Sequence, residues 1–117
     1  MRFLSMIRVE ETDQRPSERL MTEMGKLIEE MNAAGVLLDT AGLQPSAKGK
    51  RIRNNRGKFS AMDGPFAETK EVIGGFAILK ADSMAEAEAL TRRFLEVHAD
   101  EWNVECEVRQ IEEPDPA

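Results

Sequence analysis

The chain has 117 residues, of which 41% are hydrophobic and 32% are charged. This length and composition suit one folded domain, residues 1–117, and exclude an intrinsically disordered chain. The 16 basic and 22 acidic residues give a net charge of −6, which is unsuited to a dedicated binder of nucleic-acid backbones. With one cysteine and one histidine, the chain has neither an intramolecular disulfide nor a thiolate zinc cluster.

No segment of the sequence predicts export or membrane insertion. The apolar run at the N-terminus is short and is interrupted by Arg8, unlike the core of a signal peptide. Apolar stretches elsewhere fall well short of the roughly 20 residues that a membrane span requires. The sequence therefore predicts a cytoplasmic protein with no membrane partner.

Residues 2–9 alternate in the way that predicts a β-strand, with apolar side chains on both faces. Phe3 and Ile7 lie on one face, and Leu4 and Met6 lie on the other. A strand of this kind is covered from both sides.

Residues 17–34 are predicted to form an amphipathic helix. Ser17 is a suitable N-cap, and Gly35 stands where a left-handed residue ends a helix. The apolar side chains that recur with the helical period are Leu20, Met24, Leu27, Ile28 and Met31.

A short strand and a hairpin follow the helix. Residues 36–39 are predicted to form the strand. Residues 50–53 and 58–62 are predicted to pair as a hairpin that turns at Asn54–Gly57.

The last third of the chain predicts a strand, a helix and a strand. Residues 72–79 alternate with apolar groups on both faces, and Ser83 with Glu86 forms an S-x-x-E capping box at a helix start. Residues 104–109 alternate apolar and charged side chains, which predicts a strand with one buried face. Residues 112–117 are expected to be a frayed tail.

This order of elements predicts a ferredoxin-like α+β fold with an extra β-hairpin. Two helices cover one face of a sheet, yet the strands at 2–9 and 72–79 carry apolar groups on both faces. A second copy of the chain is the simplest cover for the other face. We therefore expect a homodimer packed sheet to sheet.

A motif in the middle of the chain resembles a known family. Residues 63–76 read DGPFAETKEVIGGF, which resembles the DGPF subgroup of YCII-related proteins. The resemblance extends to residues 33–38, to the bend at 42–46 and to residues 107–110. It implies a dimeric α+β barrel.

The resemblance also implies a possible catalytic pair and a partner. Wider YCII relatives carry a histidine and an aspartate that are interpreted as acid–base residues. This chain has Met24 at the matching position of the first helix, and Gln44 where many DGPF relatives have histidine in the bend. Some relatives are fused to, or encoded beside, alternative sigma factors of the extracytoplasmic-function type, which implies a sigma-factor partner.

The motif itself has a structural and a functional interpretation. In the first, Asp63 accepts backbone N–H bonds, Gly64 and Pro65 shape the turn, and Phe66 plugs the loop into the core. In the second, Asp63, Glu68 and Lys70 line a cleft beside the dimer face, where Asp63 acts as a general base or orients the donor groups of a ligand. The candidate ligand-binding residues are Gly64, Pro65, Phe66, Glu68 and Lys70.

His98 is the second candidate catalytic residue, because any histidine chemistry must use it. It could pair with Asp63 or with an acidic neighbour at a pocket rim. The structural alternative is a cationic residue favoured by the C-terminal dipole of the second helix.

Residues 48–58 carry six positive charges and no acidic residue. This cluster could be a solvated hairpin protected against aggregation, or it could dock an acidic protein; nucleic acid is the least favoured of the three interpretations.

We find no phosphate loop and no metal-ligand spacing, so no metal and no cofactor are predicted. The sequence favours a small-molecule-binding or regulatory module. The alternative is a cofactor-free isomerase or lyase that uses Asp63 with His98 or Glu68.

Overall fold

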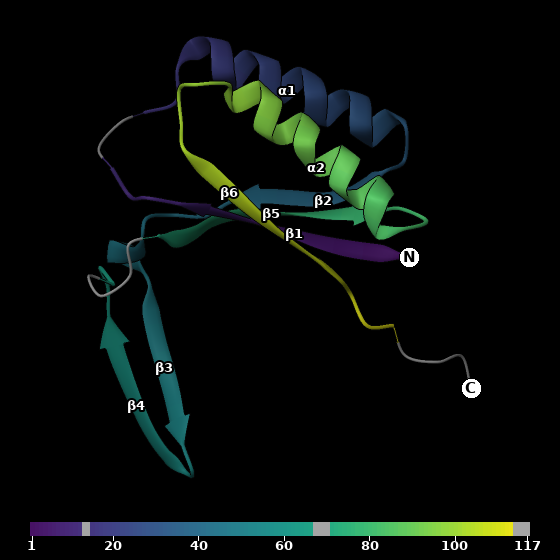
Figure 1. Ribbon diagram of the computed structural model, residues 1–117. Coiled ribbons are helices and arrows are strands. Elements are labelled where there is room, and N and C mark those ends of the chain that lie inside the picture. The colour runs from purple at the N-terminus through teal and green to yellow at the C-terminus, as the bar shows by residue number, and fades with distance from the viewer. Residues whose placement is uncertain (13–14, 67–70, 114–117) are drawn as a thin grey trace.

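The computed structural model describes residues 1–12, 15–66 and 71–113. It contains an antiparallel four-stranded sheet in the order β2-β5-β1-β6, a separate β3-β4 hairpin and two helices (Figure 1). This order confirms the ferredoxin-like α+β arrangement. The elements are β1 (Arg2–Val9), α1 (Glu18–Ala33), β2 (Leu37–Gly42), the 3-10 helix η1 (Ser46–Lys48), β3 (Lys50–Asn55), β4 (Lys58–Asp63), β5 (Val72–Lys80), α2 (Met84–His98) and β6 (Val104–Gln110).

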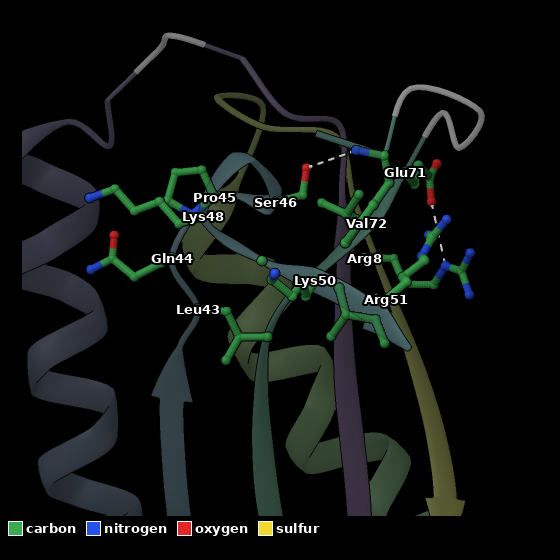
Figure 2. Close-up of a pocket in the computed structure, with 13 residues that line it drawn as sticks. Arg8, Leu43, Gln44, Pro45, Ser46, Lys48, Lys50, Arg51, Glu71 and Val72 are labelled. Atoms are coloured by element: carbon green, nitrogen blue, oxygen red, sulfur yellow. Dashed lines mark hydrogen bonds and ion pairs between the residues drawn. The ribbon is translucent and has the colours of Figure 1, made fainter. Parts of the chain in front are cut away.

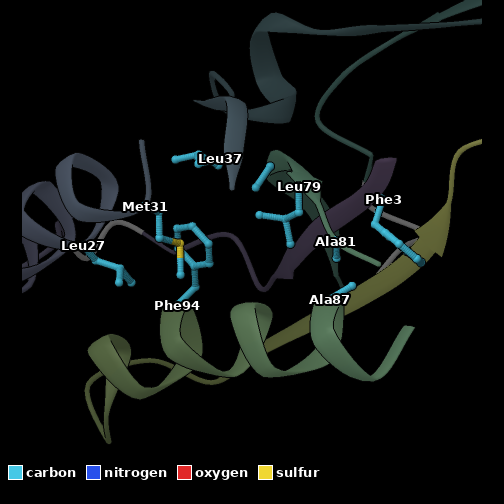
Figure 3. Packing of buried hydrophobic residues seen from close by; sticks show 9 residues of the cluster. Phe3, Leu27, Met31, Leu37, Leu79, Ala81, Ala87 and Phe94 are labelled. Atoms are coloured by element: carbon cyan, nitrogen blue, oxygen red, sulfur yellow. The ribbon is translucent and has the colours of Figure 1, made fainter. Parts of the chain in front are cut away.

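The hydrophobic core lies between the sheet and the two helices, which cover the same face (Figures 1 and 3). Phe3 of β1 pairs directly with Leu79 of β5, and both side chains are buried. Met31 of α1 and Phe94 of α2 close the core from the helical layer. The other buried members of this cluster are Leu27, Leu37, Ala77, Ala81 and Ala87.

Both helices begin at the predicted caps. Ser17 Oγ accepts a hydrogen bond from the Leu20 N–H at 3.0 Å, and Ser83 Oγ accepts one from the Glu86 N–H at 3.2 Å. The reciprocal bond of the capping box differs from the prediction, because the Glu86 carboxylate accepts the N–H of Asp82 rather than that of Ser83. Each helix start thus has acceptors for donors that lack an intrahelical partner.

The sheet face opposite the helices carries the second apolar set that the sequence predicted. Leu4 pairs with Ile78, and Met6 pairs with Phe76, and all four side chains are half-buried. We call this the helix-free face. Both helices lie on the other side of the sheet (Figure 1).

The β3-β4 hairpin projects from the helix-free side of the sheet (Figure 1). It is longer than predicted, because Asn54 and Asn55 pair with β4 and the turn consists of Arg56 and Gly57 alone. Both turn residues have positive φ angles, 53° and 92°, as a tight hairpin turn requires.

Two further boundaries differ from the sequence prediction. The strand expected at 36–39 runs from Leu37 to Gly42, with an irregularity in its pairing to β5 between Leu37 and Asp39. At the C-terminus, Glu113 forms an ion pair with Arg2 at 2.6 Å, and residues 114–117 lie outside the described part of the chain. Within the described residues, no helix has the length and apolar character needed to cross a membrane.

Candidate ligand-binding site

A cavity of about 580 Å³ lies where the hairpin leaves the sheet (Figure 2). Its volume is in the range of small-molecule sites. The walls come from the end of β1, the segment between β2 and β3, the start of β3 and the start of β5. The described lining residues are Arg8, Leu43, Gln44, Pro45, Ser46, Lys48, Gly49, Lys50, Arg51, Phe66, Glu71, Val72 and Ile73.

Ser46 holds the wall of this cavity in place. Its N–H donates to a Glu11 carboxylate oxygen at 2.6 Å, and its hydroxyl donates to the other oxygen of the same carboxylate. The Ser46 hydroxyl also accepts the N–H of Phe66 at 3.4 Å. The geometry of this wall therefore depends on two segments far apart in sequence, around Glu11 and Phe66.

Gly64 of the DGPF motif lies in close backbone contact with this wall. A Cβ atom at this position would lie 1.7 Å from the carbonyl oxygen of Ser46, so no side chain fits there. The Gly64 N–H donates to the Gly49 carbonyl at 3.1 Å. The glycine of the motif thus permits backbone contact between the end of the hairpin and η1.

The charges that line the cavity are mostly positive. Arg8, Lys48, Lys50 and Arg51 face a single acidic residue, Glu71, among the described lining residues. Figure 2 shows the two arginines and Glu71 on one side of the cavity and Lys48 on the other. Arg8 Nε lies 3.8 Å from the Glu71 carboxylate, and both side chains are partly exposed, so this ion pair is weak. An anion is the ligand that this arrangement favours.

Apolar groups complete the cavity. The Arg51 guanidinium lies 4.1 Å from the centroid of the Phe66 ring, a cation–π distance. Phe66 therefore belongs to the cavity wall. The prediction that it plugs into the hydrophobic core was wrong, because it contacts Arg51 and Gly49 and is not a member of the core cluster.

The two candidate catalytic residues are placed apart from this cavity. Asp63 lies at the end of β4 and pairs with Lys50 Nζ at 3.1 Å, with 79% of its side chain exposed. His98 ends α2, and its Nδ1 lies 2.7 Å from the Phe94 carbonyl oxygen. Neither residue lines the cavity. None of the contacts described for Asp63 and His98 links one residue to the other.

The candidate ligand-binding residues Phe66 and Pro65 line two different cavities. Pro65 lines a second cavity of about 600 Å³, together with Trp102, whose buried Nε1 has no described hydrogen-bond partner. Gly64 sets the backbone contact described above. Glu68 and Lys70 lie outside the described residues.

The sequence did not predict the roles of Arg8 and of the Glu11–Ser46 bonds at the cavity. For Arg8 the available signal was a cation at the end of a predicted strand. Three members of the basic cluster at residues 48–58 line the cavity, namely Lys48, Lys50 and Arg51. Among the described residues, no group of His, Cys, Asp or Glu side chains could hold a metal ion.

The pH response of Glu11 tests the anchoring of the wall. The Ser46 hydrogen bonds hold the pKa of the Glu11 carboxyl below its usual value. Because the folded-state pKa is lowered, the stabilisation is present above the unfolded-state pKa of about 4.3 and is lost as pH falls through the folded-state value. We expect Ser46→Ala to raise the pKa of Glu11, as measured by carboxyl-carbon NMR. Ser60→Ala, on the exposed β4 strand, is the control, and an equal pKa in all three proteins would contradict the expectation.

Comparison with known proteins identifies the family. Residues 1–112 match the YCII-related domain. An uncharacterized protein of Rhizobium meliloti (strain 1021) is 37% identical over 70 residues, which cover 60% of this chain and 56% of that relative. The alignment thus spans little more than half of the relative's length, whereas the family match spans almost all of this chain. The chain belongs to the YCII-related domain family.

Proposed function

We propose that this protein is a binding module for a small anion with an apolar body, and that the cavity at the base of the hairpin is its site. The supporting observation is the composition of the cavity wall, in which four cations stand among apolar side chains. The cations would contact a carboxylate or phosphate group, and Leu43, Val72 and Ile73 would contact the apolar part. The described residues thus provide cations for the charged end of the ligand and apolar contacts for its other end.

The alternative is a cofactor-free isomerase or lyase that uses Asp63 with His98 or Glu68. An acid–base mechanism needs two titratable groups that converge on one cavity. The binding module is favoured over the enzyme because Asp63 forms an ion pair with Lys50, and His98 contacts a backbone carbonyl of its own helix. The DGPF subgroup, the sigma-factor partner and the cytoplasmic location stay predictions from the sequence.

The proposed module is a homodimer. The support is the helix-free face, where half-buried Leu4, Met6, Phe76 and Ile78 have no helix above them. A second copy would bury this face, since one sheet packs on another through such apolar surfaces. Light scattering at micromolar concentration measures the mass, and a monomer would contradict this part of the proposal.

Binding of benzoate, followed by NMR chemical shifts, tests the site. We expect benzoate to shift the amide signals around Ser46 and Arg51, and benzyl alcohol, which lacks the charge, to bind at least fivefold more weakly. Arg8→Gln should weaken benzoate binding about tenfold, because it removes a charged donor worth roughly 1.5 kcal/mol.

Arg53→Gln is the matched control, because Arg53 lies on β3 two residues beyond Arg51 but does not line the cavity. It should leave benzoate affinity within about twofold of the original. Equal losses in the Arg8 and Arg53 variants, or equal affinity for benzoate and benzyl alcohol, would contradict the proposed function.

A further inference from the structure

The β3-β4 hairpin exposes an apolar face. Ile52 and Phe59 are 73% and 74% exposed, respectively. They lie on the same face, because Ile52 pairs with Ala61 and Asn54 pairs with Phe59, and side chains two residues apart share a side of the ladder. An isolated two-stranded hairpin is marginally stable in water. Large apolar side chains on such a hairpin therefore indicate a packing partner.

The chain exposes more surface than a compact monomer of its size. Its radius of gyration is 16.3 Å, against about 13.4 Å for a compact chain of this length. Its accessible surface is 8705 Å², against roughly 6,400 Å² for a compact monomer of this mass. The excess of about 2,300 Å² per chain is what an obligate homodimer with a large interface buries on each subunit.

Charge favours a second copy of this chain as the partner. Residues 48–58 carry +6, and because the whole chain carries −6 the remaining residues carry −12. The edge strand β6 displays exposed Glu105 and Glu107 at the border of the helix-free face, together with exposed Arg109, and Glu107 lies 3.9 Å from Arg8 of its own chain. A basic hairpin of one copy and an acidic body of another are therefore complementary in charge.

The geometry allows the hairpin to reach that body. Each of its strands has six residues, a length of about 20 Å at 3.4 Å per residue. Packed sheets lie only about 10 Å apart. Since the hairpin projects from the helix-free side (Figure 1), it extends past the sheet of a copy that covers this face and lies along its flank.

We propose that the β3-β4 hairpin is a dimerisation arm that packs Ile52 and Phe59 against the second copy, with its cationic side chains near the acidic β6 edge of that copy. This inference rests on the homodimer of the proposed function. Its test is separate from that of the anion site, which benzoate binding provides.

The first test compares dimer dissociation constants by analytical ultracentrifugation. Ile52→Ser combined with Phe59→Ser should raise the dissociation constant at least tenfold. The control combines Met21→Ser with Met84→Ser, which replaces side chains that are 64% and 47% exposed on the helices, and should leave the constant within about twofold. If the hairpin variant leaves the dissociation constant unchanged, the proposal of a dimerisation arm is overturned and the homodimer stands. If the unmodified protein is a monomer, both proposals are overturned.

The second test does not depend on how the variants fold. Isotope-labelled and unlabelled unmodified chains are mixed to form dimers for isotope-filtered NMR. The Ile52 signals are assigned as those that disappear from the spectrum of the Ile52→Val variant. We expect nuclear Overhauser contacts from the Ile52 methyl groups of one copy to protons of the other. Contacts of Ile52 only within its own chain would overturn the proposal.

Discussion

Gly64→Ala is expected to separate the end of the hairpin from η1 and to abolish benzoate binding. The added methyl group would lie 1.7 Å from the Ser46 carbonyl oxygen and 2.6 Å from its carbon. These atoms belong to the backbone and cannot rotate away, so a whole segment must move. We expect a loss of about 3 kcal/mol in the free energy of unfolding, the upper range for overpacking. Urea unfolding measures the loss of stability. The amide signals of residues 44–49, recorded with and without benzoate, report the separation from η1 and the loss of benzoate binding.

Gly25→Ala is the matched control for this substitution. Gly25 lies within α1 and has no atom within 4 Å of an added Cβ. Alanine is a better helix former than glycine by up to about 1 kcal/mol. The same chemical change should therefore stabilise the protein at one position and destabilise it at the other. A Gly64 variant as stable as the original, with unchanged amide signals, would show that the close contact with Ser46 is not required.

Leu79→Ala is expected to have an effect of similar size through the core. Leu79 is fully buried between its cross-strand partner Phe3 and the helices. Removing most of its side chain leaves a cavity, and such losses cost about 3 kcal/mol. Urea unfolding at one fixed protein concentration provides the measurement, since association changes apparent stability.

Leu38→Ala makes the same chemical change at a leucine that is 49% exposed. We expect it to cost less than about 1 kcal/mol, because a half-exposed side chain has less transfer free energy to lose. Equal destabilisation by the Leu38 and Leu79 substitutions would contradict the position of the core between the sheet and the helices.

The helices and most strands were predictable because their signals are local. Ser17 and Ser83 cap the helices in which they were placed, since a cap depends on residues three positions away. The alternation in β1 and β5 likewise depends on neighbours within the strand, and it correctly predicted two apolar faces. The hairpin turn was two residues too wide in the prediction, because Asn54 and Asn55 are frequent in turns but here pair with β4.

The candidate site was less predictable because it depends on contacts between distant segments. Arg8 and Arg51 line one cavity although 43 positions separate them. Gly64 looked like a turn residue, which is the common reason for a glycine in a loop. Its role in the close approach to Ser46 appears only when η1 and the end of β4 are placed together.

Strand β3 connects the cavity with the exposed apolar face through consecutive residues. Lys50 and Arg51 line the cavity, and Ile52 follows on the face that we assign to dimerisation. A displacement of this strand would change both surfaces at once. Thermodynamic linkage then makes the coupling reciprocal: because each dimer carries two copies of the site, a ligand that tightens the dimer tenfold when both copies are filled must bind each site of the dimer about threefold better than the monomer. The occupancy of the site would then depend on how much of the protein is present as well as on the ligand.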